Sequence, residues 1–149
     1  MNALLLRSSS SSRSALPIVP TLLSLTPIRI FRIQGDVRAT VIATTRYEKE
    51  ARRLLSEDER DAMQKAIAAD PEAHPVVPAT GGVRKARWGR QGKGKSGGVR
   101  VIYYYLVSDT EVYMLSVYSK NEQSNMTEAD RKAAKGFVEA LKNAKKESR

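Results

Sequence analysis

The chain has 149 residues, of which 41% are hydrophobic. This is enough to bury the core of one domain, and it excludes a fully disordered polyelectrolyte. The formal net charge of +10 favours a polyanionic partner such as a nucleic acid, although a basic solvated face on an ordinary domain would give the same total. The absence of cysteine and a single histidine, His74, exclude disulfides, thiolate metal sites and histidine-pair zinc sites, and no metal or cofactor is expected. No apolar run approaches the ~18 residues of a membrane span, so no membrane partner is expected.

The first 38 residues differ in composition from the rest of the chain. They contain a serine run from Ser8 to Ser12, and Asp36 is their one acidic residue. Organelle transit peptides have such a composition, but translation from an upstream start codon would also produce it. We favour the second explanation. Residues 1–38 are therefore expected to be a disordered extension, followed by one domain over residues 39–149.

The first half of this domain is expected to hold a strand and two helices. Residues 39–44 are β-branched and apolar, as in a short strand. Apolar residues at helical spacing indicate a first helix: Tyr47, Ala51, Leu54 and Leu55. Ser56 and Glu59 form a capping box that begins a second helix, which should end before Asp70. Its buried face is predicted to consist of Ala62, Met63, Ala66 and Ile67.

The second half is expected to hold three strands and a helix. The strands are predicted over 83–88, 99–107 and 111–118, with a flexible loop over 89–98 and a turn at 108–110. Thr127 and Asp130 resemble a capping box, and a helix should follow it. The packing stripe of this helix is Ala134, Phe137, Val138 and Leu141. The order β-α-α-β-β-β-α predicts an α+β fold in which helices pack on an antiparallel sheet.

The most informative feature is a basic block without acidic residues between Ala73 and Ser108. Its seven cations are Arg84, Lys85, Arg87, Arg90, Lys93, Lys95 and Arg100. Such a density of positive charge fits a polyphosphate backbone, because each neutralised phosphate also releases a counterion. Trp88 and the run 103–105 could stack on unpaired bases, although we expect Trp88 to lie in the core. The block therefore indicates RNA or single-stranded nucleic acid.

Strand alternation places Lys85 and Arg87 on one face and Arg84 on the other. Arg100 begins the next strand and lies nearby if the glycine-rich loop closes a hairpin. Three cations would then converge on one phosphate and stabilise the charge of a phosphoryl transition state. The alternative is that they are phosphate anchors or contacts for an acidic protein. Residues 89–96 also match the letters of a phosphate loop, but a strand pattern follows where that motif needs a helix.

A second polar cluster follows the last predicted strand. Tyr118, Lys120, Asn121 and Glu122 lie within five residues of one another. A tyrosine, a lysine and a glutamate at a strand end can supply an acid, a base and a charge. Connections between a strand and a helix are commonly polar, so the cluster alone is a weak signal.

Three segments, 81–88, 94–104 and 118–122, resemble the HigB branch of the RelE/ParE toxin superfamily, and the resemblance covers about residues 40–145. It implies a curved antiparallel sheet with two N-terminal helices and a C-terminal helix. It also implies a bacterial, cytoplasmic toxin of a type II toxin–antitoxin system that cleaves mRNA on the ribosome without a metal, through attack by the RNA 2′-hydroxyl. The partners would be the ribosome, mRNA and a HigA-like helix-turn-helix antitoxin, with DNA contacted only through the antitoxin.

The resemblance also implies roles for individual residues. The predicted catalytic residues are Lys85, Arg87, Arg100, Lys120 and Glu122. The predicted RNA-binding residues are Arg84, Arg90, Lys93, Lys95, Tyr118 and Asn121. A tyrosine and histidines that relatives use have no clear match in this chain, so Lys85 and Glu122 both stay candidates for the general base. The alternatives are a ParE-like toxin that inhibits gyrase by binding, and a non-catalytic RNA- or ribosome-binding module.

Overall fold

The computed structural model describes residues 27–31, 39–90 and 94–148. Its strands are β2 (Pro27–Phe31), β3 (Thr40–Thr44), β4 (Arg84–Arg90), β5 (Gly94–Leu106) and β6 (Glu111–Ser119). Its helices are α2 (Thr45–Leu54), α3 (Glu57–Ala69) and α4 (Glu128–Glu147), and a short 3-10 turn, η3 (Val107–Asp109), joins β5 to β6. The predicted α+β class is confirmed.

The strands form one sheet in the order β2-β3-β6-β5-β4. Strands β4, β5 and β6 are the predicted antiparallel meander. The expectation of a wholly antiparallel sheet is wrong, because β3 pairs with β6 in parallel. The chain passes from β3 to β4 through two helices and the segment 70–83, which returns it to the starting end, so β4 and β6 run in the direction of β3.

Two predicted boundaries differ from the structure. The segment 89–98 was expected to be a loop, but β4 extends to Arg90 and β5 begins at Gly94. The two strands continue their pairing beyond the apolar core, where Arg90 lies opposite Gly94. The extension was expected to be disordered, yet β2 within it pairs with β3 in antiparallel fashion. The remaining residues of the extension lie outside those the structure describes.

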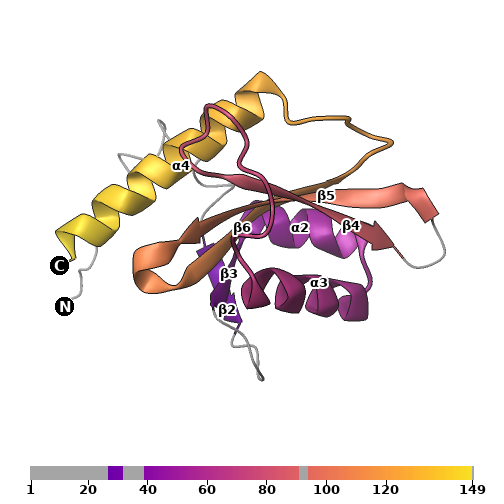
Figure 1. Ribbon diagram of the computed structural model, residues 1–149, viewed down its shortest axis with the longest axis horizontal. Coiled ribbons are helices and arrows are strands. Elements are labelled where there is room, and N and C mark those ends of the chain that lie inside the picture. The colour runs from indigo at the N-terminus through magenta and orange to yellow at the C-terminus, as the bar shows by residue number, and fades with distance from the viewer. Residues whose placement is uncertain (1–26, 32–38, 91–93, 149) are drawn as a thin grey trace, which may run out of the picture.

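The sheet separates two hydrophobic clusters, with α2 and α3 on one face and α4 on the other (Figure 1). Tyr47 and Met63 pack with Tyr103 on the first face, whereas Phe137 packs with Tyr104 on the second. Tyr103 and Tyr104 therefore lie on opposite faces of the sheet. Toward the tip of the β4–β5 hairpin the sheet extends beyond α4 (Figure 1), and the strands of this hairpin contain Lys85, Arg87 and Arg100.

Both predicted capping boxes are present, at Ser56 with Glu59 and at Thr127 with Asp130. The buried face of α3 differs from the prediction, because Ala62 and Ala66 are exposed. Gln64 and Ala68 are buried there instead, beside Met63 and Ile67. A glutamine is tolerated in this face because the Tyr47 hydroxyl donates to Gln64 Oε1 at 2.9 Å. Among the described residues, no helix has the length and hydropathy that crossing a bilayer would need.

Candidate functional site

Three polar residues lie in one row across the meander. The ladder places Arg87 of β4 opposite Arg100 of β5, and Arg100 opposite Tyr118 of β6. Directly paired residues share a face of a sheet, so the three side chains are neighbours on the α4 side. Lys85 lies two residues before Arg87 and therefore shares this face. The predicted convergence of Lys85, Arg87 and Arg100 thus agrees with the strand register; we call Arg87, Arg100 and Tyr118 the cationic row.

The centre of the cationic row has hydrogen-bond donors without acceptors. Arg100 is only 8% exposed as a residue, and its guanidinium has no hydrogen-bond or ion-pair partner among the described residues, although none of its nitrogens is fully buried. Tyr118 is 6% exposed, and its hydroxyl is buried without a hydrogen-bond partner in the described parts of the chain. Burial raises the pKa of the Tyr118 phenol, although the nearby Arg100 charge opposes the shift. The phenol therefore stays protonated and is a donor without an acceptor among the described residues.

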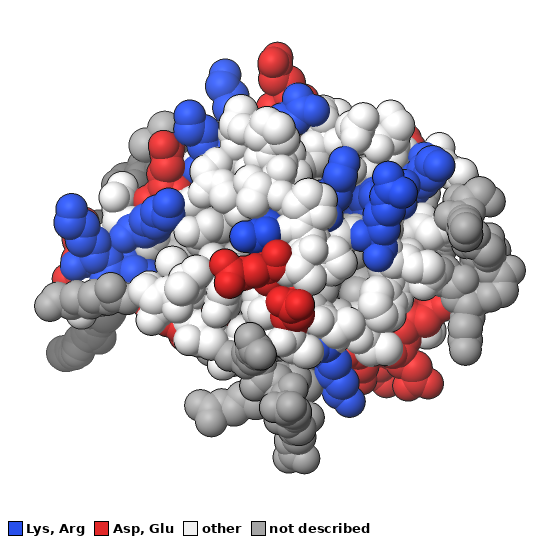
Figure 2. All heavy atoms as spheres, viewed as in Figure 1, with Lys and Arg blue, Asp and Glu red and all other residues white. Residues whose placement is uncertain are grey.

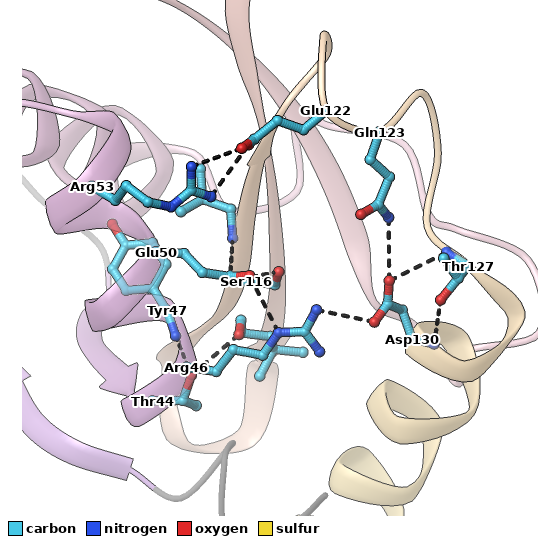
Figure 3. A network of polar contacts seen from close by, with 12 residues as sticks. Thr44, Arg46, Tyr47, Glu50, Arg53, Ser116, Glu122, Gln123, Thr127 and Asp130 are labelled. Carbon is cyan, nitrogen blue, oxygen red and sulfur yellow. Dashed lines mark hydrogen bonds and ion pairs between the residues drawn. The ribbon is translucent and has the colours of Figure 1, made fainter.

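The α2 side of the site is held by a fully paired polar network (Figure 3). β3 ends at Thr44, so the edge of β6 beyond Met114 has no neighbouring strand. Glu50 of α2 replaces that strand, because its Oε1 accepts from Ser116 Oγ at 2.9 Å and from the Val117 N–H at 3.2 Å. This side chain satisfies backbone that would otherwise be unpaired.

Arg46 connects this edge to the helix on the other face. Its Nε lies 3.5 Å from Glu50 Oε2, and its Nη2 lies 3.0 Å from Asp130 Oδ1 at the start of α4. Burial opposes ionisation of Asp130, but hydrogen bonds from Arg46, Thr127 and Gln123 outweigh it and lower the pKa of this carboxyl. A small pocket lies between Arg46, Tyr118 and Met126, under the first turns of α4.

The segment 120–127 connects β6 to α4, and its residues contact α2 and β4. Glu122 Oε2 accepts from Arg53 Nη1 of α2 at 2.7 Å, and this hydrogen bond lowers the pKa of the Glu122 carboxyl. A lower pKa makes Glu122 a weaker base, which weakens its case as the general base. Lys120 and Asn121 are exposed. Farther along the segment, Asn125 Oδ1 accepts from Lys85 Nζ at 3.1 Å.

The other predicted site residues fall into two groups. Arg84 points away from the cationic row and donates to the carbonyl oxygens of Glu72 and His74, at 3.2 and 2.6 Å. It therefore holds the segment 71–75 against the domain. The side chains of the predicted RNA-binding residues Arg90, Lys93 and Lys95 lie outside the described residues. Trp88 is half-buried and packs against the core cluster of α2 and α3, as expected.

Figure 2 shows one group of lysine and arginine side chains toward the end of the molecule where β4 ends and another at the end that holds the C-terminus of α4. Sequence reasoning missed Arg46, Glu50, Arg53 and Asn125, because only the tertiary fold brings them to the site. Within the described residues, no group of three or more acidic or histidine side chains is arranged to hold a metal ion.

Comparison with known proteins gives a family for this arrangement. One similar solved structure is that of the E. coli toxin RelE, a double arginine-to-alanine mutant in the free state. It is 19% identical, covers 59% of this chain and 88% of its own chain, and superposes with a TM-score of 0.44. A family model described as the RelE toxin of the RelE/RelB toxin–antitoxin system matches residues 39–148. Since that match covers most of the sequence, the chain belongs to the RelE family of toxins from toxin–antitoxin systems.

Proposed function

We propose that this protein is a ribosome-dependent endoribonuclease that cleaves mRNA and so inhibits translation. The observation that carries the proposal is Arg100, an 8% exposed residue whose guanidinium has no acceptor among the described residues and which is paired in the sheet with Arg87 and Tyr118. None of its nitrogens is fully buried, so the guanidinium can bind an anion that reaches the surface, which fits a site that an anion completes. A phosphodiester supplies that anion, and planar guanidinium groups match its oxygens.

In this mechanism the 2′-hydroxyl of the substrate attacks the adjacent phosphorus. The P–O5′ bond breaks, leaving a 2′,3′-cyclic phosphate on one fragment and a 5′-hydroxyl on the other. The proton lost from the 2′-oxygen is taken up by a base, and the leaving 5′-oxygen gains one. The extra negative charge on the phosphoryl oxygens is stabilised by Arg87, Arg100 and Lys85. In metal-dependent nucleases a bound metal ion stabilises this charge. Lys120 and Asn121 lie exposed beside this site and would contact the RNA.

The proposed partners follow from the family. An antitoxin partner is typical of this toxin family, and we infer that it is HigA-like, with a helix-turn-helix domain that alone contacts DNA. The site of action would be the translating ribosome, which places the protein in the bacterial cytoplasm. The net charge of +10 is compatible with binding to ribosomal RNA.

The test is cleavage of mRNA on programmed ribosomes by the purified full-length chain. We expect fragments that end in a 2′,3′-cyclic phosphate, and a single 2′-deoxy substitution at the cleaved position should abolish them. Naked mRNA of the same sequence should remain intact. Growth arrest on expression with intact mRNA on the ribosome would contradict the proposal and favour a toxin that acts by binding.

A further inference from the structure

We propose that Asn125 is a positioning residue, which holds the Lys85 ammonium beside the cationic row before RNA arrives; this rests on the proposed function. Lysine has a long, flexible side chain, so an unrestrained Lys85 would lose much conformational freedom on binding a phosphate. The 3.1 Å hydrogen bond from Lys85 Nζ to Asn125 Oδ1 restrains it in advance. The two residues are 40 positions apart in the sequence.

The backbone that presents Asn125 is itself fixed. Gln123 Nε2 donates to the Asn125 carbonyl oxygen at 2.6 Å and to Asp130 Oδ2 at 3.2 Å. The next residue, Met126, is buried in the same hydrophobic cluster as Tyr118. Figure 3 shows Gln123 reaching toward Asp130 at the start of α4. The backbone on both sides of Asn125 is therefore held in place, as a group with a positioning role requires, while its exposed side chain contacts Lys85.

The chemistry of the amide fits this role better than a carboxylate would. The amide oxygen accepts a hydrogen bond from the ammonium without neutralising its charge. Two Lys85 protons remain for the phosphate, and the positive potential of the row is kept. An aspartate at this position would form an ion pair with Lys85 and compete with the phosphate for it.

The experiment measures single-turnover mRNA cleavage on programmed ribosomes, with Asn125→Ala and Lys85→Ala made separately and together in the full-length chain. Asn125→Ala should lower the maximal rate about tenfold, while the protein concentration at half-maximal rate changes less than about twofold. In the Lys85→Ala background, whose slower cleavage is followed over hours, Asn125→Ala should have no further effect. Asn125→Asp should lower the rate and also weaken ribosome binding.

Ser124→Ala, an exposed neighbour in the same segment, is the matched control and should cleave as the unmodified chain does. If the unmodified chain cleaves mRNA and the Asn125→Ala variant cleaves it at the same rate, the proposed function still stands but the inference is wrong. An equal loss in both backgrounds would also overturn it, because a collapsed loop acts independently of Lys85. If the unmodified chain leaves mRNA intact on the ribosome, the proposed function fails and the inference fails with it.

Discussion

Two polar regions lie side by side in this domain, and they differ in how their charges are satisfied. Around Glu50 every element of the network has a partner: Glu50 accepts from β6, and Arg46 contacts both Glu50 and Asp130. In the cationic row, Arg100 and Tyr118 are more buried than Glu50 and Arg46, yet the Arg100 guanidinium and the Tyr118 hydroxyl contact no acceptor among the described residues. A network that is complete in the free protein stabilises the fold, whereas an incomplete one leaves donors that a ligand could satisfy, as the proposed function requires.

The largest expected effect comes from removing the positive charges in and beside the cationic row. Arg100→Ala, or Lys85→Ala together with Arg87→Ala, should abolish measurable mRNA cleavage while the melting temperature stays the same or rises. Each lost donor should cost on the order of 2–4 kcal/mol of transition-state stabilisation, about 30- to 10³-fold in single-turnover rate. The fold should tolerate Arg100→Ala, because Arg100 has no hydrogen-bond or ion-pair partner among the described residues that the change would break.

Arg52→Ala is the control for charge alone, because Arg52 is an exposed arginine of α2 away from the cationic row. It should change the cleavage rate little. Equal, salt-dependent losses of cleavage rate in Arg100→Ala and Arg52→Ala would mean that the cationic row only attracts RNA electrostatically and takes no part in the cleavage step.

Substitutions in the polar network around Glu50 should have the opposite effect and lower the stability more than the cleavage rate. Glu50→Ala should lower the free energy of unfolding by about 2–4 kcal/mol, because Ser116 Oγ and the Val117 N–H lose their acceptor and Arg46 keeps only Asp130. Urea denaturation measures this loss. The folded fraction should still cleave mRNA within a few-fold of the unmodified rate. Lys49→Ala, an exposed neighbour on α2, is the control and should unfold as the unmodified chain does.

The stability that the polar network around Glu50 contributes should depend on pH through Asp130. Its pKa in the folded protein is lowered from the usual value of 3.8, so the stabilisation is present above that pH and is lost as the pH falls through the folded value. Asp130→Asn should therefore cost about 2 kcal/mol near neutral pH. The difference from the unmodified chain should shrink in acid, as followed by urea denaturation between pH 7 and pH 2. A difference that stayed constant with pH would contradict this account, and Glu128→Gln in the same helix turn is the control.

The sequence predicted those features that depend on neighbouring residues. The capping boxes at Ser56 and Thr127 are local, and strand alternation was enough to place Lys85 and Arg87 on one face, whereas Arg100 joins them through the hairpin register. The contacts of Asn125 with Lys85, Arg53 with Glu122 and Arg46 with Asp130 join residues 40, 69 and 84 positions apart. No periodicity reports such distant pairs, because they depend on how the elements pack.

Local reasoning also failed where a polar residue is buried by a distant partner. From the residue types alone, Gln64 is expected to face solvent on α3, and Ala62 and Ala66 are expected to lie in the core. The Tyr47 hydroxyl satisfies the Gln64 amide, which lets Gln64 and Ala68 turn inward and leaves the two alanines exposed. The parallel pairing of β3 with β6 was missed for a related reason, since it depends on the path of segment 70–83.

The smallest effect is expected where the two regions meet, at the exposed pair of Arg53 and Glu122. Breaking it should change the stability little, and high salt should remove even that change. If Glu122 acts only by holding the segment 120–127, Arg53→Ala and Glu122→Ala should each slow cleavage about threefold, with no additional loss in the double variant. Lys120→Ala should slow cleavage more than either, because its exposed ammonium faces the RNA rather than the protein. Single-turnover rates decide the matter: a Glu122→Ala loss far greater than that of Arg53→Ala would make Glu122 the general base after all.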